Sequence, residues 1–168
     1  MSVVIQDTLC QAVIDHLHYS VVRLTAWRFK GKFYGVTYKN DRRIELVQSA
    51  GRLIFLHEVG HALCGSSIRG RYLEEVSVEI FKFLIITDGD MTKAMKKFWT
   101  YWNNGAWDRM MIDWIMHYEE VKKETAKKLL KIRKIDWKKA KMHGRRLWRT
   151  EFGQLINRMN KNKAKLGV

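Results

Sequence analysis

The residues best suited to chemistry are two histidines and a glutamate in the sequence LIFLHEVGHALCG, residues 53–65. On a helix, His57 and His61 stand on one face one turn apart, so both imidazoles can bind a single metal ion. Glu58 is rotated from His57 by about 100°, which places its carboxylate beside the metal rather than on it. Zinc accepts such nitrogen ligands and lowers the pKa of water that it binds. The pattern therefore predicts a zinc site with Glu58 as the general base.

A catalytic zinc ion also needs a third protein ligand. No histidine occurs between His61 and His117, so the nearby candidates are carboxylates. The otherwise apolar segment 73–87 contains glutamates one turn apart, at positions 75 and 79. Because a buried acidic side chain on an apolar helix needs a partner, we expect Glu79 to be the third ligand, with Glu75 as the alternative.

The segments that must position these residues combine short strands with helices. A helix is expected over residues 8–20, capped by Asp7. Three segments rich in β-branched and aromatic residues predict an antiparallel meander of strands: 22–29, 32–39 and 43–48. The helix that carries the two histidines should end at Gly65, and segment 73–87 should form the next helix.

The Asp-Gly-Asp sequence at residues 88–90 marks a boundary between two halves of the chain. Six of the seven tryptophans lie beyond it, and we expect their rings to form the core of a small helical bundle. The chain contains no proline, which favours long uninterrupted helices, here expected over 91–102, 107–134 and 136–160. The expected fold class is α+β, with a catalytic part over residues 1–90 and an all-helical part over residues 91–168.

Nearly all of the net charge of +15 lies in the second half. Residues 1–90 contain 11 Lys and Arg against 10 Asp and Glu, whereas residues 91–168 contain 21 against 7. This excess is more than solubility requires, so we expect the basic half to bind an anionic partner, with nucleic acid favoured. An anionic membrane surface or an acidic protein is the alternative.

The sequence 35–65, followed by VEIFKFLI, resembles gluzincin metallopeptidases, and in particular the small ImmA/IrrE-like family of bacteria, their phages and mobile elements. In that family a strand and a short polar turn precede HE-x-GH-x-L-x-G, and a later helix supplies a glutamate in an E-A-x-x-F pattern. The matching residues are His57, Glu58, Gly60, His61, Leu63, Gly65, Glu79 and Phe83, with Ile80 at the alanine position. The match covers residues 30–87, about a third of the chain. It implies a zincin-like domain over residues 1–90 that binds zinc through His57, His61 and Glu79.

A zinc-dependent metallopeptidase that hydrolyses peptide bonds of a protein substrate is therefore the expected function. The strand near 43–47 would lie against the substrate, and the basic half would localise the enzyme. A tyrosine or histidine donor should stabilise the oxyanion, and four are available: Tyr72, Tyr101, His117 and Tyr118. The alternative is a non-catalytic protein, either nucleic-acid-binding or part of a particle, that retains a zincin-like fold.

Other features of the sequence carry less information about function. The chain has neither a secretory signal pattern nor an apolar run of about 18 residues, so we expect it in the cytosol. The resemblance to the ImmA/IrrE-like family implies a bacterial or phage-infected cell, with association with a particle as the alternative. Cys10 and Cys64 are too few for a disulfide scaffold and are expected to be small core residues. The spacing of His16, His18 and His143 does not indicate a metal site.

Overall fold

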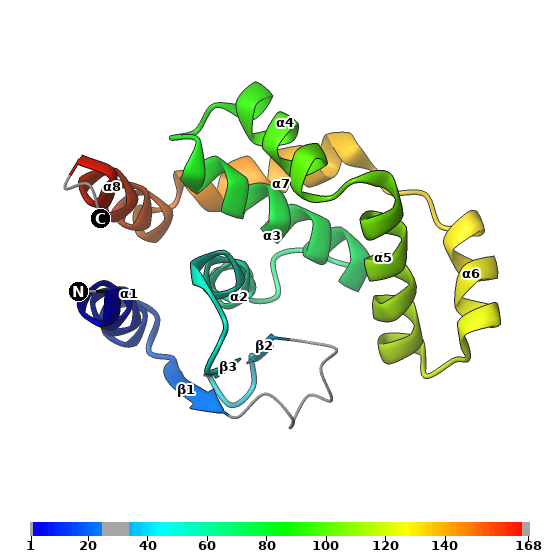
Figure 1. The fold of residues 1–168 in the computed structure, drawn as a ribbon, viewed down its shortest axis with the longest axis horizontal. Coiled ribbons are helices and arrows are strands. Elements are labelled where there is room, and N and C mark those ends of the chain that lie inside the picture. The colour runs from blue at the N-terminus through cyan, green and yellow to red at the C-terminus, as the bar shows by residue number, and fades with distance from the viewer. Residues whose placement is uncertain (1, 25–33, 166–168) are drawn as a thin grey trace.

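In the part that the structure describes, the first half of the chain folds into a helix, a three-stranded sheet and two further helices (Figure 1). The computed structural model describes residues 2–24 and 34–165. The elements of this half are α1 (Ser2–Leu17), β1 (Ser20–Leu24), β2 (Gly35–Tyr38), β3 (Arg43–Val47), α2 (Arg52–Cys64) and α3 (Arg71–Ile86). The helices expected over the histidine motif and over 73–87 are confirmed, as is the α+β class. The first helix begins well before Asp7, which is therefore not its cap.

The sheet is mixed, so the expected antiparallel meander is wrong. β3 lies in the middle, with β1 parallel to it on one side and β2 antiparallel to it on the other. The turn at residues 39–42 makes β2 and β3 a hairpin, but β1 pairs with β3 instead of with β2. Strand propensity predicts that a segment is extended and leaves open which neighbour it pairs with. Residues 25–33, where part of the first two expected strands falls, lie outside the described residues.

Helix α2 packs between the sheet and α3, and this position buries most of its length. Phe55, Leu56 and Val59 are almost completely inaccessible and belong to one hydrophobic cluster with β3 and α3. Gly60 allows the close approach of α3, because a Cβ at this position would lie 2.8 Å from Cβ of Val78. The helix ends at Gly65, whose φ of 56° favours glycine. The motif residues are thus held on a helix with little freedom to move.

The second half contains five helices in place of the three long ones expected. They are α4 (Met91–Tyr101), α5 (Asn104–Glu119), α6 (Lys123–Ile132), α7 (Trp137–Arg149) and α8 (Glu151–Lys165). The expected helix 107–134 is interrupted at Glu120, which adopts a left-handed conformation after α5. The expected helix 136–160 is interrupted at Thr150, whose hydroxyl accepts a hydrogen bond from the backbone N–H of Gly153. Local capping, without any proline, was therefore sufficient to end these helices.

Helix α3 lies at the centre of the molecule and contributes to two hydrophobic clusters (Figure 1). One of its faces packs with α2 and the sheet, and the other packs with α4, α5 and α7. The last helix, α8, lies next to the first, α1: the ring centroids of Phe152 and His16 are 5.9 Å apart. The chain segments before and after residue 90 therefore share buried surface on both sides of α3.

The tryptophans of the second half largely line its core, as expected. Trp107 and Trp114 are buried, and Trp102, Trp137 and Trp148 pack against the same cluster. Trp99 stacks near Trp137 with 5.1 Å between ring centroids, although it remains 42% exposed. Among the described residues, no helix is both long and apolar enough to cross a membrane.

Gly144 offers a test of the contact between α3 and α7. A Cβ at this position would lie 2.8 Å from Cγ2 of Ile80 and 3.1 Å from the carbonyl oxygen of Ser77. We expect Gly144→Ala to lower the free energy of unfolding by up to about 2 kcal/mol, since overpacking exceeds the gain of about 1 kcal/mol in helix propensity. Urea denaturation measures the change. In Gly51→Ala the new Cβ would meet no atom within 4 Å, so equal losses in both variants would contradict the explanation.

Candidate metal centre

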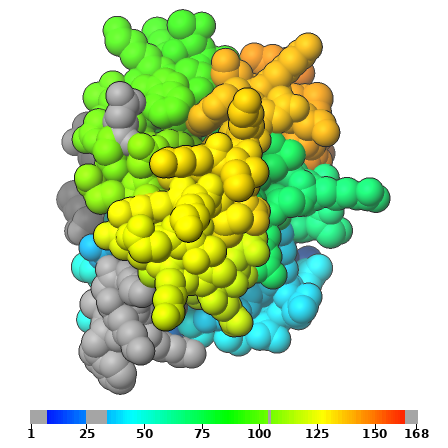
Figure 2. All heavy atoms as spheres, turned by 90° about the vertical axis from the view of Figure 1, so that its right-hand side faces the viewer, coloured from blue at the N-terminus to red at the C-terminus, as the bar shows by residue number. Residues whose placement is uncertain are grey.

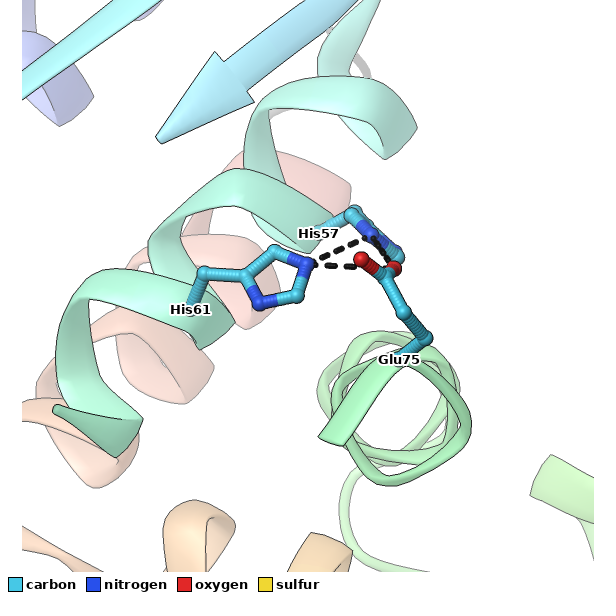
Figure 3. A group of neighbouring side chains, drawn as sticks. All are labelled: His57, His61 and Glu75. Carbon is cyan, nitrogen blue, oxygen red and sulfur yellow. Dashed lines mark hydrogen bonds and ion pairs between the residues drawn. The ribbon is translucent and has the colours of Figure 1, made fainter. Parts of the chain in front are cut away.

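Helices α2 and α3 bring two histidines and one glutamate together. The Nε2 atoms of His57 and His61 lie 3.1 Å apart. Oε2 of Glu75, in the second turn of α3, lies 3.0 Å from the first of these atoms and 3.2 Å from the second (Figure 3). Ligand atoms of a tetrahedral zinc ion with bonds of about 2.0 Å are about 3.3 Å apart, so this donor set fits zinc. Among the described residues, these three form the group that can share a metal ion.

Two further glutamates of α3 hold the opposite nitrogens of the histidines. Nδ1 of His57 lies 2.5 Å from Oε1 of Glu79, and Nδ1 of His61 lies 2.5 Å from Oε2 of Glu74. When each Nδ1–H donates to its carboxylate, the lone pair of Nε2 points toward the other histidine and Glu75. This is the arrangement by which carboxylates orient histidine ligands in metal sites. Three glutamates of α3 therefore contact the two histidines of α2.

The structure does not place Glu79 where the sequence predicted it, because the residue that faces both Nε2 atoms is Glu75. The two glutamates lie one turn apart on the same side of α3, and the ring of His57 lies between them. Which turn of α3 faces the two Nε2 atoms depends on how α3 crosses α2. This crossing cannot be read from the spacing of residues along the chain. Glu74, to which the sequence assigned no role, was missed. The only signal for it was the run of carboxylates in an apolar segment.

Glu58, the expected general base, lies beside this group and is held by β2. Its Oε2 accepts a 2.6 Å hydrogen bond from the hydroxyl of Thr37, which also lies 3.0 Å from its carbonyl oxygen. Glu58, the two histidines and Glu75 line one pocket of about 920 Å³, here called the metal-site pocket, together with all four residues of β2. β3 is the central strand, and none of its described residues lines this pocket. The strand at the pocket is β2.

The helical second half also reaches this site. The hydroxyl of Tyr118 donates to Oε1 of Glu75 at 2.8 Å, and Nε1 of Trp102 donates to Oε2 of Glu79 at 2.6 Å. The ring of Trp114 lies 6.4 Å from that of His57. The sequence did not predict these contacts of Trp102 and Tyr118 with the glutamates or of Trp114 with His57. The only indication in the sequence was that aromatic residues with polar tips occur in the second half.

The other residues considered from the sequence lie in several places. His117 and Tyr118 line the metal-site pocket, whereas Tyr101 lines a neighbouring one and Tyr72 donates to Glu119. Cys64 is buried, as expected, with its thiol 3.5 Å from Glu74, and Cys10 packs against the first hydrophobic cluster. Within the described part of the chain, the group that can hold a metal includes neither His16, His18 nor His143.

The charges of the site are strongly coupled. Burial by itself would lower the pKa of His57, but hydrogen bonds to Glu75 and Glu79 raise it to about 9. Burial would likewise lower the pKa of His61, but Glu75 and Glu74 raise it well above its ordinary value. Burial alone would raise the pKa of Glu75 and Glu79, but His61 and His57 hold the pKa of Glu75, and Lys82 and His57 that of Glu79, below the usual range. Both shifts favour imidazolium–carboxylate pairs when no cation is bound, so the binding of a cation is coupled to the release of protons.

Comparison with protein-family models, curated proteins and solved structures found no match. The resemblance to gluzincins therefore continues to rest on the motif at residues 57–65 and on the segment around Glu79. The structure adds the convergence of ligand atoms and the carboxylates behind them. The chemistry of the site is inferred from these residues.

The coupled charges predict how the stability of the metal-free protein depends on pH. Raised histidine pKa values stabilise the fold fully below the ordinary value of 6.5, and this contribution is lost as pH rises through about 9. Lowered glutamate pKa values stabilise it above their ordinary value of 4.5, and this contribution is lost in acid. Urea unfolding of chelator-treated protein should therefore give greatest stability between pH 4.5 and 6.5.

At saturating zinc, the loss of stability that the metal-free protein shows between pH 6.5 and about 9 should be reversed. Zinc binds the neutral imidazoles, so its contribution to stability should rise as pH increases from 6.5 to about 9. A metal-free profile that is flat across this interval would contradict the imidazolium–carboxylate description.

Proposed function

We propose that this protein is a zinc-dependent metallopeptidase in which His57, His61 and Glu75 hold the metal and Glu58 is the general base. The observation that supports this most is the convergence of two Nε2 atoms and one carboxylate oxygen, 3.0 to 3.2 Å apart, beside a further carboxylate in an open pocket. Three protein ligands leave the fourth position of a zinc site to water or substrate, as catalysis requires. Glu75 replaces Glu79 as the proposed third ligand.

Zinc at such a site supplies a Lewis acid and makes water a nucleophile near neutral pH. Glu58 accepts the proton of the attacking water and then delivers it to the nitrogen of the leaving amine. Thr37 orients Glu58, because its hydroxyl donates to one carboxylate oxygen and leaves the other available. Glu75 and the histidines stay fixed, since each is held from behind by another side chain.

A peptide in extended conformation fits the position of β2. β2 pairs with β3 on one side, and among the described strands none pairs with its other side. A substrate can add to that edge through main-chain hydrogen bonds, which suits protein substrates of varied sequence. The peptide carbonyl would then lie near His117, an expected oxyanion donor that lines the metal-site pocket, whereas Tyr118, which also lines it, donates its one hydroxyl hydrogen to Glu75. Burial and Glu75 raise the pKa of Tyr118, so its hydroxyl stays protonated and able to donate.

We also propose that the second half binds a polyanion, with nucleic acid favoured, in the cytosol. Helix α7 buries Ala140, Gly144 and Leu147 and exposes a basic stripe on nearly the opposite side. The α7 basic stripe consists of Lys138, Lys141, Arg145 and Arg149. Figure 2 shows this end of the molecule, with α6 at the front and part of α7 above it. Basic side chains in a row, without acidic ones between them, suit contacts to successive phosphates.

Replacement of Glu58 tests the peptidase proposal. Glu58→Gln should retain one zinc per chain, because Glu58 is not among the proposed ligands, and should lower peptide hydrolysis about 100- to 10,000-fold. Zinc content and cleavage of casein or a peptide library are measured on the same preparations. Glu124→Gln is the matched control, since that side chain is 80% exposed on α6.

The competing function is that of a non-catalytic nucleic-acid-binding or particle protein with the same fold. Zinc bound by both wild type and Glu58→Gln, with hydrolysis by neither, would favour it and reject the peptidase.

Charge removal on α7 tests polyanion binding. Lys141→Gln with Arg145→Gln should weaken binding to duplex DNA and reduce the slope of log Kd against log salt by about 2, one for each phosphate contact. Lys96→Gln with Lys97→Gln removes the same charge from exposed positions on α4 and is the control. Equal effects of both pairs would mean that only net charge matters. Binding without salt dependence would exclude phosphate contacts.

A further inference from the structure

The second half of the chain supplies hydrogen-bond donors to the glutamates of the metal centre. Trp102, at the end of α4, donates to Oε2 of Glu79, and Tyr118, in the last turn of α5, donates to Oε1 of Glu75. Both glutamates belong to α3, in the first half. Neither donor has a role in the metal-ligand group itself.

Glu79 is fixed from several sides. Its Oε1 lies 2.5 Å from Nδ1 of His57, and Lys82, which is 3% exposed, donates to both carboxylate oxygens at 2.7 and 2.8 Å. The indole N–H of Trp102 completes this set at 2.6 Å. Because a carboxylate that accepts several charge-assisted or short hydrogen bonds has few alternative orientations, the ring of His57 is held as well.

Glu75 is fixed by a single donor on the side away from the histidines. The Tyr118 hydroxyl occupies Oε1, and the remaining Oε2 is the atom that faces both Nε2 nitrogens. Loss of that donor would let the carboxylate rotate or turn both oxygens toward the metal. Tyr118 therefore selects which oxygen can act as the ligand.

We propose that Trp102 and Tyr118 are positioning residues of the metal centre, so that the helical second half completes a site whose ligands all come from the first half. The inference rests on the proposed zinc site. It gives residues 91–168 a role in metal affinity that is separate from their positive charge.

The test compares zinc affinity of the full-length chain with and without each donor. Tyr118→Phe removes only the hydroxyl, and Trp102→Phe removes the indole N–H while keeping an aromatic ring beside Tyr101 and Trp107. Zinc Kd is measured by competition with a chromophoric chelator at fixed pH. We expect each variant to bind zinc at least about 10-fold more weakly, as for other residues that orient metal ligands.

Two matched controls separate positioning from packing. Tyr72→Phe removes a tyrosine hydroxyl that donates at 3.1 Å to Glu119, a glutamate outside the metal centre. Trp99→Phe alters a tryptophan that packs on Phe98 and Trp137. Both should leave the zinc Kd within about two-fold of wild type, since neither touches a site glutamate.

Thermal unfolding of the metal-free variants and the visible spectrum of the Co²⁺-loaded forms provide second readouts. Weaker zinc binding with an unchanged metal-free melting temperature and an altered Co²⁺ spectrum supports the proposal. Wild-type Kd in both donor variants, or equal losses in the controls, overturns it. A wild-type chain that binds no zinc overturns both this inference and the zinc site. Weakened binding in the variants together with absent hydrolysis supports the inference while rejecting the peptidase.

Discussion

The structure depends on compensating charge that is buried between α2 and α3. Two histidines, three glutamates and Lys82 meet there with little access to water, and isolated charges in such a place would be strongly destabilising. Each carboxylate therefore has at least one cationic or hydrogen-bonding partner. The crossing of the two helices brings these partners together.

These hydrogen bonds orient the two histidines as in a metal site whose ligands are held in place before the metal binds. The Nδ1 atoms are committed to Glu74 and Glu79, which leaves the Nε2 atoms and Glu75 directed at one another. In the absence of a cation, protons on the imidazoles balance the carboxylates, and the raised histidine pKa values express this. The same residues therefore stabilise the fold without metal and are able to bind a metal ion when protons leave.

The two halves of the chain differ in charge, yet the structure does not separate them. Helix α3 carries the glutamates on one face and packs against α4, α5 and α7 with the rest of its surface. Trp102 and Tyr118 donate to the glutamates from α4 and α5, while the side chains of the α7 basic stripe are exposed. Core, metal centre and charged surface are thus distinct faces of one helical assembly.

The sequence by itself predicted the α+β class, the helix that carries His57, Glu58 and His61, and the aromatic core, because helical spacing and apolar periodicity are local properties. It did not predict the strand order, the breaks at Glu120 and Thr150, or that Glu75, the alternative to Glu79, is the glutamate that faces both Nε2 atoms. The breaks follow from local backbone conformation and capping, whereas the strand order and the position of Glu75 depend on which surfaces meet. β1 pairs with β3, and α3 crosses α2 so that Glu75, one turn before Glu79, faces both Nε2 atoms. Tertiary packing decided them, because distances between helices cannot be read from spacing along one chain.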